Sequence, residues 1–315
     1  MTGLIRLGRL IALVGLIRLL AVGVVALVTC AQVTGRAQEA RGLADVLRAK
    51  FASDLEAIAR QADGVVGYVV IDVESGERFA RLDGVPFPTA STIKLAILYE
   101  LLTQADQGRV SLDAAAPMDR SRAVPGGLLY ELTNPSLSPR DLAVAMILQS
   151  DNTATNVLID RVGMAAVNRR MAALGLSGTR LRRHMIDLEA ARRGDENVAT
   201  PADLARLVLA FHRGEGLSAS SKVIALEILR KFKRTPIRSG VPPEVEVASK
   251  GGDLEGVRAD AGIVYVPGRP YVFVAMGTFL REDAQPSGAL EQLARASYEY
   301  FSRRATVSEY GRQIR

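Results

Sequence analysis

Residues 90–102 have the sequence ASTIKLAILYELL, and the rest of the fold is best understood from this stretch. Its dense apolar residues predict a helix buried in the protein core. Thr89, Ser91 and Thr92 offer side-chain oxygens that can cap the start of this helix. Lys94 does not fit the pattern, because a cation in the first turn faces the positive end of the helix dipole and a buried lysine is costly unless paired or neutral. This lysine therefore needs a chemical explanation.

Ser91 and Lys94 are three residues apart, so a helix brings the serine hydroxyl and the lysine amine to one face. A serine hydroxyl is a weak nucleophile until a base takes its proton, and a lysine can be that base only when it is neutral. Burial and a nearby positive charge lower the pKa of a lysine and favour the neutral form. The backbone N–H of Ser91 can also stabilise an oxyanion. The pair predicts a nucleophilic serine with a lysine base, although a capping serine explains Ser91 alone.

Two further polar stretches interrupt apolar surroundings. Ser150-Asp151-Asn152 lies between two predicted helices, where a hydroxyl can relay a proton to a leaving nitrogen and an amide can hold both a substrate amide and Lys94. Lys250-Gly251-Gly252 lies on a predicted strand, where the cation can bind a carboxylate or polarise the serine and the glycines admit a substrate backbone. Taken alone, Asn152 could be a helix cap and Lys250 a solvated strand end. The occurrence of all three motifs in this order favours a catalytic centre.

The order of the predicted elements indicates an α+β fold. Residues 64–84 predict two strands joined at a Glu-Ser-Gly turn, residues from 139 to about 232 are mainly helical, and strands return from 244 with a hairpin turn at 268–270. An antiparallel sheet built from the N- and C-terminal parts and flanked by helices accounts for this order. A mostly helical second lobe would then lie against the sheet, with the active site in the cleft.

The first 38 residues are predicted to lie outside this fold. Arg6, Arg9 and Arg18 accompany an apolar run from Leu19 to Cys30, which is typical of a signal peptide. An uncleaved membrane anchor is the main alternative, although Arg18 would then lie in mid-span, and lipidation at Cys30 is a third. All three predict export to the periplasm or the extracellular space, with or without a membrane tether. The expected exported parts are a domain at 43–304 and a tail at 305–315.

Composition narrows the functional classes. The 315-residue chain is 48% hydrophobic and 23% charged, as is usual for a globular protein. Its net charge of +6 comes mostly from scattered arginines that are not interleaved with aromatic residues, so nucleic-acid binding is not expected. One cysteine and two histidines exclude a disulfide framework and argue against a structural zinc site. We therefore expect that the protein needs no metal or other cofactor. We also expect a monomer.

The three motifs and the stretches FPTASTIKLAILYELL, LSPRDLAVAMILQSDNTATNVLI and VASKGG resemble a class A β-lactamase, within the wider group of penicillin-binding serine enzymes. The resemblance covers residues 43–304 and implies that a β-lactam or a cell-wall peptide acylates Ser91. It implies that Lys94 is the base or a partner in a water relay, and that Ser150 passes a proton to the leaving nitrogen. It also implies substrate-binding positions, which are Asn152, Lys250, Gly252, Asp253 through a backbone N–H of the oxyanion hole, and Arg258 as a carboxylate-binding arginine.

The chain departs from this family pattern in two places. Gly251 replaces the hydroxyl residue of the usual Lys-Thr-Gly motif, which removes a hydrogen bond worth about 1 kcal/mol. The family's Glu-x-x-Leu-Asn loop, whose glutamate activates the deacylating water, corresponds to residues 185–189, so that Met185 stands at the glutamate. Asp187 and Glu189 are the nearby carboxylates that can replace this base if the loop is shifted. The alternative is that both are surface charges without a catalytic role.

The resemblance therefore predicts a serine β-lactamase-type hydrolase that opens the β-lactam amide through an acyl-enzyme on Ser91. Two alternatives share this first step. One is a D-Ala-D-Ala peptidase or esterase, and the other is a penicillin-binding receptor that is acylated and deacylates slowly.

Overall fold

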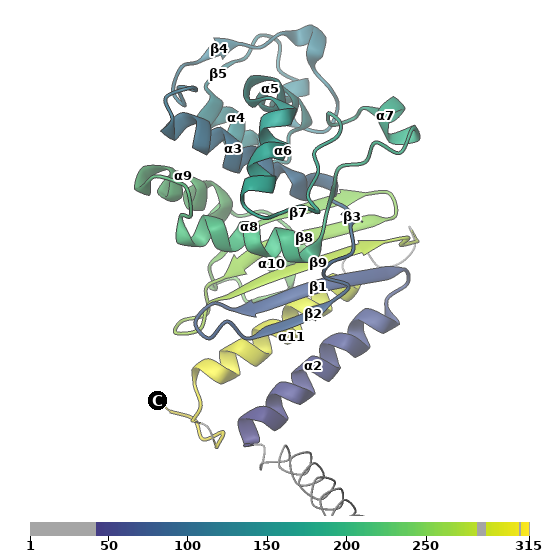
Figure 1. Cartoon of the computed structure of the whole chain (residues 1–315), viewed down its shortest axis with the longest axis vertical. Coiled ribbons are helices and arrows are strands. Elements are labelled where there is room, and N and C mark those ends of the chain that lie inside the picture. Colours follow the sequence, from purple (N-terminus) through teal and green to yellow (C-terminus); the bar gives the residue numbers. More distant parts are fainter. Residues whose placement is uncertain (1–41, 282–287, 309, 315) are drawn as a thin grey trace, which may run out of the picture. The chain divides into compact units, whose positions relative to one another are not determined.

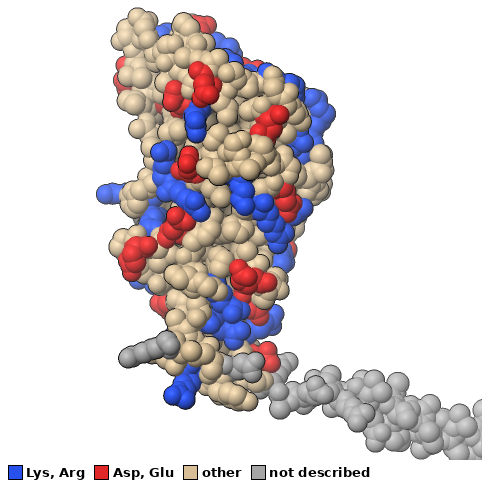
Figure 2. All heavy atoms as spheres, turned by 90° about the vertical axis from the view of Figure 1, so that its left-hand side faces the viewer, with Lys and Arg blue, Asp and Glu red and all other residues tan. Residues whose placement is uncertain are grey.

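The computed structural model describes residues 42–281, 288–308 and 310–314, and the predicted N-terminal signal peptide or anchor lies outside them. Residues 42–48 with 310 and 311 form one unit by their contacts, and residues 49–308 with 312–314 form the other. The second unit carries the fold described here. Within the described ranges, no helix has the length and apolar character that crossing a membrane requires. On the face shown in Figure 2, basic and acidic side chains are interspersed.

A five-stranded antiparallel sheet lies at the centre of this unit (Figure 1). Its strands, in spatial order, are β2 (Arg78–Arg81), β1 (Val65–Asp72), β9 (Tyr271–Thr278), β8 (Val257–Val264) and β7 (Val247–Leu254). The N-terminal hairpin joins the C-terminal strands through β1 and β9, where Val69 lies opposite Val274. The α+β fold, with its sheet assembled from both ends of the chain, is therefore confirmed.

Helices cover both faces of the sheet. The helices of the described residues, which include those that pack around one another away from the sheet, are α2 (Leu43–Gln61), α3 (Lys94–Asp106), α4 (Pro139–Leu148), α5 (Asn152–Val162), α6 (Met164–Ala173), α7 (Leu188–Arg192), α8 (Pro201–Arg213), α9 (Ala219–Arg230), α10 (Pro236–Gly240) and α11 (Gly288–Ala305). α8 packs on β1, β8 and β9, and α11 packs on β9 from the other side (Figure 1). Tyr271 of β9 stacks on Phe301 of α11 with ring centroids 4.3 Å apart.

The predicted buried helix is α3, and every residue from Lys94 to Gln104 is buried. It is surrounded by α4, α5, α6, α8 and α9. A short 3₁₀ turn (Ala90–Ile93) precedes it, and the predicted side-chain cap is wrong, because no side chain accepts a hydrogen bond from this start. The Thr92 hydroxyl instead donates to the Thr89 carbonyl at 2.7 Å, which fixes the turn from its own backbone. The first N–H groups of the turn are therefore left without a side-chain acceptor.

The aperiodic stretch between α3 and α4 forms a long connection that contains short strands and turns. β4 (Ala116–Pro117) pairs with β5 (Ser136–Leu137), and two 3₁₀ turns (Arg120–Arg122 and Leu128–Tyr130) lie between them. A second small pair joins β3 (Phe87–Pro88) to β6 (Val198–Ala199), so the segment leading into α3 is tied to the segment leading into α8. Both pairings hold loops that border the site described next.

Candidate active site

A cavity of about 520 Å³ opens where α3 begins, α4 ends, and β7 meets the loop before α10. Of the residues singled out in the sequence, those lining it are Ser91, Ser150, Asn152, Lys250, Gly252, Asp253 and Arg258. Lys94 is fully buried and reaches the same centre through hydrogen bonds to Ser150 and Asn152. The tertiary structure thus brings the three motifs into one site.

The backbone around Ser91 is held in an uncommon conformation. Ala90 has a φ of 44° and Ser150 a φ of 55°, so both occupy the left-handed region that non-glycine residues seldom adopt. A Cβ on Gly252 would lie 2.7 Å from the Ser91 nitrogen and 2.8 Å from the Thr89 carbonyl oxygen. Glycine is therefore required at 252 for β7 to pack against the turn that carries Ser91, a reason additional to the substrate contact expected from the sequence.

The Ser150 hydroxyl lies at the centre of a hydrogen-bond network. It donates to the Ser91 hydroxyl oxygen at 2.8 Å and accepts from Lys94 Nζ at 3.0 Å and Lys250 Nζ at 3.1 Å. Lys94 also donates to the Ser150 carbonyl at 2.7 Å and to Asn152 Oδ1 at 3.0 Å. Lys94 is thus linked to Ser91 through a second serine, where the sequence predicted a closer pairing on one helix face.

Both lysines of this network are buried, and this changes their protonation. Burial lowers the pKa of Lys94 well below its usual value, and the positive charge of Lys250 lowers it further, whereas Asp151 opposes the shift. Burial lowers the pKa of Lys250 to about 7, against the opposing influence of Asp260. Two ammonium groups beside one hydroxyl repel each other, so the site favours a state in which one of them is neutral.

Asn152 and Asp151 join α5 to the long connection after α3. The Asn152 amide nitrogen donates to the Pro125 carbonyl at 3.0 Å, and its backbone N–H donates to the Gly126 carbonyl at 3.0 Å. Asp151 caps α5 by accepting from the Ala154 N–H at 2.8 Å, as its expected role in the turn requires. The amide of Asn152 is therefore fixed between Lys94 and the wall of the cavity.

The third motif is completed from a different part of the chain. A Cβ on Gly251 would lie 3.0 Å from Cγ2 and 3.3 Å from Cβ of Thr235, which precedes α10. Thr235 caps α10 and its hydroxyl hydrogen bonds to the buried Asp260, whose pKa burial raises to about 6. A side chain at 251 would therefore press against Thr235, which would have to shift by a few tenths of an ångström to admit it.

The loop before α10 also brings two cations to the cavity that the sequence analysis missed. Lys233 and Arg234 both line it. Burial lowers the pKa of Lys233 to about 8, and its ammonium donates to the carbonyls of Leu229 at 2.6 Å and Lys231 at 2.7 Å. The basic residues at 231–234, followed by a Thr-Pro helix start, could have indicated a cationic loop. They did not indicate that the side chains of Lys233 and Arg234 point toward the cavity.

Arg258 lies at the cavity, but its guanidinium has a partner. Its Nη1 is 2.9 Å from Asp253 Oδ2, across the strand pair in which these residues lie opposite each other. The sequence offered two alternatives for Arg258, a carboxylate-binding residue or an exposed strand arginine. In the structure Arg258 lines the cavity, as a carboxylate-binding residue would, but its guanidinium is paired with Asp253.

The two candidate deacylation bases do not line this cavity. Asp187 caps α7 by accepting from the Ala190 N–H at 2.9 Å, and Glu189 is exposed and pairs with Arg192 at 2.5 Å. Met185 is buried in the core, and its N–H donates to Asn156 Oδ1 at 2.7 Å. Asp253 is accordingly the one carboxylate among the described residues that line the cavity. Among those residues, no group of three His, Cys, Asp or Glu side chains is arranged to hold a metal ion.

Comparison with known proteins agrees with this geometry. Residues 50–301 match the model of the β-lactamase enzyme family. The β-lactamase AST-1 of Nocardia asteroides is 30% identical over 232 residues, which is 71% of this chain and 75% of that protein. An ancestral class A β-lactamase superposes with a TM-score of 0.74 at 27% identity, covering 80% of this chain and 100% of the other. The L158E mutant of PBP-A, solved as an acyl-enzyme complex with penicillin G, superposes with a TM-score of 0.72 at 31% identity, covering 80% and 96%. This chain belongs to the β-lactamase enzyme family.

Proposed function

We propose that this protein is a serine β-lactam hydrolase that works through an acyl-enzyme on Ser91. In the first step the Ser91 oxygen bonds to the carbonyl carbon of the β-lactam amide, and the carbon–nitrogen bond breaks. The serine proton leaves as the bond forms, and the ring nitrogen gains a proton as it departs. Water then attacks the acyl carbon, which releases the product acid and restores the Ser91 hydroxyl.

The proton route runs through Ser150. Ser91 can give up its proton only if the Ser150 hydroxyl turns to accept it, and Ser150 can accept only if it passes its own proton onward. A neutral Lys94, 3.0 Å from the Ser150 oxygen, is the acceptor that the lowered pKa makes available. The same hydroxyl, once reoriented, can deliver a proton to the leaving nitrogen. Lys250 contributes positive charge on the other side of Ser150.

The remaining groups have positioning roles in this proposal. The backbone N–H groups of Ser91 and Asp253 would stabilise the oxyanion, and the close approach of Gly252 to the Ser91 nitrogen supports their lying together. The Asn152 amide would hold the substrate amide, and the positive charge of Lys250 would favour a substrate that carries a carboxylate. Arg258 lies at the same cavity but is paired with Asp253.

The single observation that carries the proposal is the hydrogen-bonded chain from Lys94 through Ser150 to Ser91. Its test is the intact mass of the protein from residue 40 onward, followed over time after mixing with penicillin G. An adduct on Ser91 that forms and then disappears is expected. Ser91→Ala should form no adduct, whereas Ser302→Ala, a change on the partly exposed end of α11, should behave as the unmodified protein does. An adduct that survives Ser91→Ala would overturn the mechanism.

A second candidate function shares the first step and differs in the second. A penicillin-binding receptor, or a peptidase or esterase acting on D-Ala-D-Ala-like cell-wall peptides, would also form the adduct on Ser91 but release a β-lactam slowly. The observation in its favour is that Met185 takes the place of the glutamate, while Asp187 and Glu189 are engaged outside the cavity. An adduct that persists for hours, together with turnover of a D-Ala-D-Ala peptide, would select this candidate.

We further propose that the protein is exported and acts as a monomer outside the cytoplasm. The basic and apolar leader within residues 1–38 supports export, through a cleaved signal peptide or a retained membrane tether. N-terminal sequencing of the protein purified from its native host distinguishes the two. A mature N-terminus near residue 38 indicates cleavage, and an intact leader in the membrane fraction indicates a tether.

A further inference from the structure

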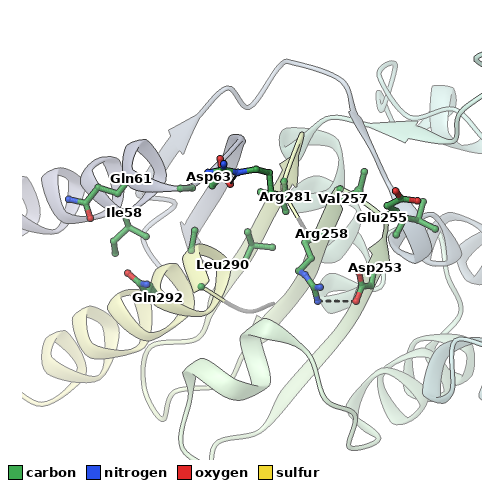
Figure 3. Close-up of a pocket in the computed structure, with 16 residues that line it drawn as sticks. Ile58, Gln61, Asp63, Asp253, Glu255, Val257, Arg258, Arg281, Leu290 and Gln292 are labelled. Carbon is green, nitrogen blue, oxygen red and sulfur yellow. Dashed lines mark hydrogen bonds and ion pairs between the residues drawn. The ribbon is translucent and has the colours of Figure 1, made fainter. Parts of the chain in front are cut away.

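The β7–β8 hairpin places two oppositely charged side chains next to each other at the cavity. Asp253 and Arg258 lie opposite each other on the two strands, and their side chains form an ion pair of 2.9 Å. Both residues line the cavity that contains Ser91, and both also line a second cavity of about 620 Å³. Figure 3 shows the pair from that second cavity, with the guanidinium directed to the carboxylate.

In this pair the carboxylate of Asp253 competes with a substrate carboxylate for the guanidinium of Arg258. A guanidinium binds a carboxylate through its N–H groups, and it recognises a second one less well when its charge is already balanced. Asp253 is held opposite Arg258 by the strand register, so its carboxylate is always near. The Asp253 side chain is 62% exposed, so solvent screens the ion pair and its competing effect on Arg258 is modest in size.

Arg234, which lines the same cavity, offers a contrast. It is exposed, it lines the cavity, and no hydrogen bond or ion pair engages it within the described residues. Its backbone is nevertheless fixed. Lys233 before it donates to two carbonyls of its own segment, and Thr235 after it caps α10. Arg234 is therefore a cation with a held backbone and a guanidinium open to a ligand.

We propose that Asp253 is a specificity-determining residue that withholds Arg258 from the carboxylate of an anionic substrate, so that Arg234 binds that carboxylate instead. The inference rests on the proposed acylation of Ser91 and concerns which substrates reach that step. The protein should therefore prefer anionic over neutral substrates less strongly than it would if both Arg234 and Arg258 were free to bind the carboxylate.

The test compares the second-order rate constant of Ser91 acylation for a penicillin and for its methyl ester, which lacks the carboxylate. The ratio of the two rate constants reports recognition of the carboxylate alone. Asp253→Asn retains the backbone N–H at 253 and removes the competing charge, so the acid-to-ester ratio should rise about three- to tenfold. Arg234→Ala should lower the ratio about tenfold, whereas Arg303→Ala on α11 serves as the matched control.

A double-mutant cycle isolates the role of the ion pair. Arg258→Ala should lower the acid-to-ester ratio at least about threefold more in the Asp253→Asn background than in the original chain, because only there is the guanidinium free. Equal effects of Arg258→Ala in both backgrounds, or an unchanged ratio in Asp253→Asn, would overturn the proposal for Asp253. An unchanged ratio in Arg234→Ala would overturn the assignment of Arg234. Absence of a Ser91 adduct with either compound would instead refute the proposed function itself.

Discussion

The cavity around Ser91 and the loop at residues 183–195 hold their ionisable groups in opposite ways. In the cavity, Lys94 and Lys250 are buried, their pKa values are lowered, and both donate to one hydroxyl. In the loop, the carboxylates are partly or fully solvated. Asp187 caps its own helix, and Glu189 pairs with an arginine three residues away. The cavity therefore holds a lysine that can accept a proton, whereas the carboxylates of the loop are bound to neighbouring groups in the loop itself.

This difference separates the two halves of the proposed reaction. Acylation needs a nucleophile and a neutral base in fixed contact, and burial supplies both conditions at Ser91. Deacylation needs a base beside a water molecule at the acyl group, and the loop carboxylates have partners elsewhere. The chain is therefore better organised to form the acyl-enzyme than to hydrolyse it, and mutations in the two regions should affect different steps.

Replacing Lys94 should have the largest effect, because it removes the proposed proton acceptor. Lys94→Met is expected to slow the acylation of Ser91 by about 10³-fold, which is within the range of general-base contributions. Stopped-flow measurement of adduct formation with nitrocefin gives the rate. Lys50→Met changes an exposed lysine that pairs with Asp54, and it should leave the rate unaltered. A Lys94→Met protein that acylates within tenfold of the original would show that another group takes the proton.

A side chain at position 251 should be the next most damaging change, because it would press against Thr235. Gly251→Thr restores the usual motif in sequence but overpacks this contact, and we expect a loss of about 1–3 kcal/mol in the free energy of unfolding. Thr235→Ser removes the methyl group and keeps the hydroxyl that caps α10. The double variant Gly251→Thr/Thr235→Ser should therefore recover most of the loss, measured by urea denaturation. If Gly251→Thr alone is as stable as the original, the contact does not constrain this motif.

The pH dependence should reveal the two lysines separately. Acylation requires neutral Lys94, whose pKa is well below its usual value, so the rate should be maintained at neutral pH and fall as acid protonates this lysine. Lys250, with a pKa of about 7, is charged below that pH and neutral above it. The KM for a penicillin should then rise about three- to tenfold from pH 6 to pH 9, whereas the KM for its methyl ester should stay constant. Parallel changes for both compounds would exclude a charge effect of Lys250 on binding.

Neutralising the loop carboxylates should have the smallest effect. Asp187→Asn and Glu189→Gln are expected to change the rate at which the Ser91 adduct disappears by less than about twofold, because neither side chain lines the cavity. The rate follows from intact mass after excess penicillin is removed. A tenfold slower release in one of these variants would identify that residue as the deacylation base and would mean that the loop moves toward Ser91 during the reaction.

Much of the fold followed from local sequence patterns. The apolar density of residues 95–102 predicted a buried helix, and the turn within residues 64–84 predicted the hairpin of β1 and β2, because these features depend on neighbours in sequence. The cap expected from Thr89, Ser91 or Thr92 failed, since the chain enters α3 through a 3₁₀ turn stabilised by its own backbone. The side chains of Lys233 and Arg234 could not be placed, because the direction of a loop residue depends on the element against which the loop packs.

The sequence by itself determined that two serines, two lysines and an asparagine belong to one ordered set on an α+β framework, because each motif has its own local element and spacing. Only the tertiary structure decided how that set is connected. It placed Ser150 between the two lysines, Thr235 against Gly251, and Asp253 opposite Arg258. These contacts join residues that are distant in the chain or depend on strand register, and both are fixed by the packing of the whole core, which no local pattern encodes.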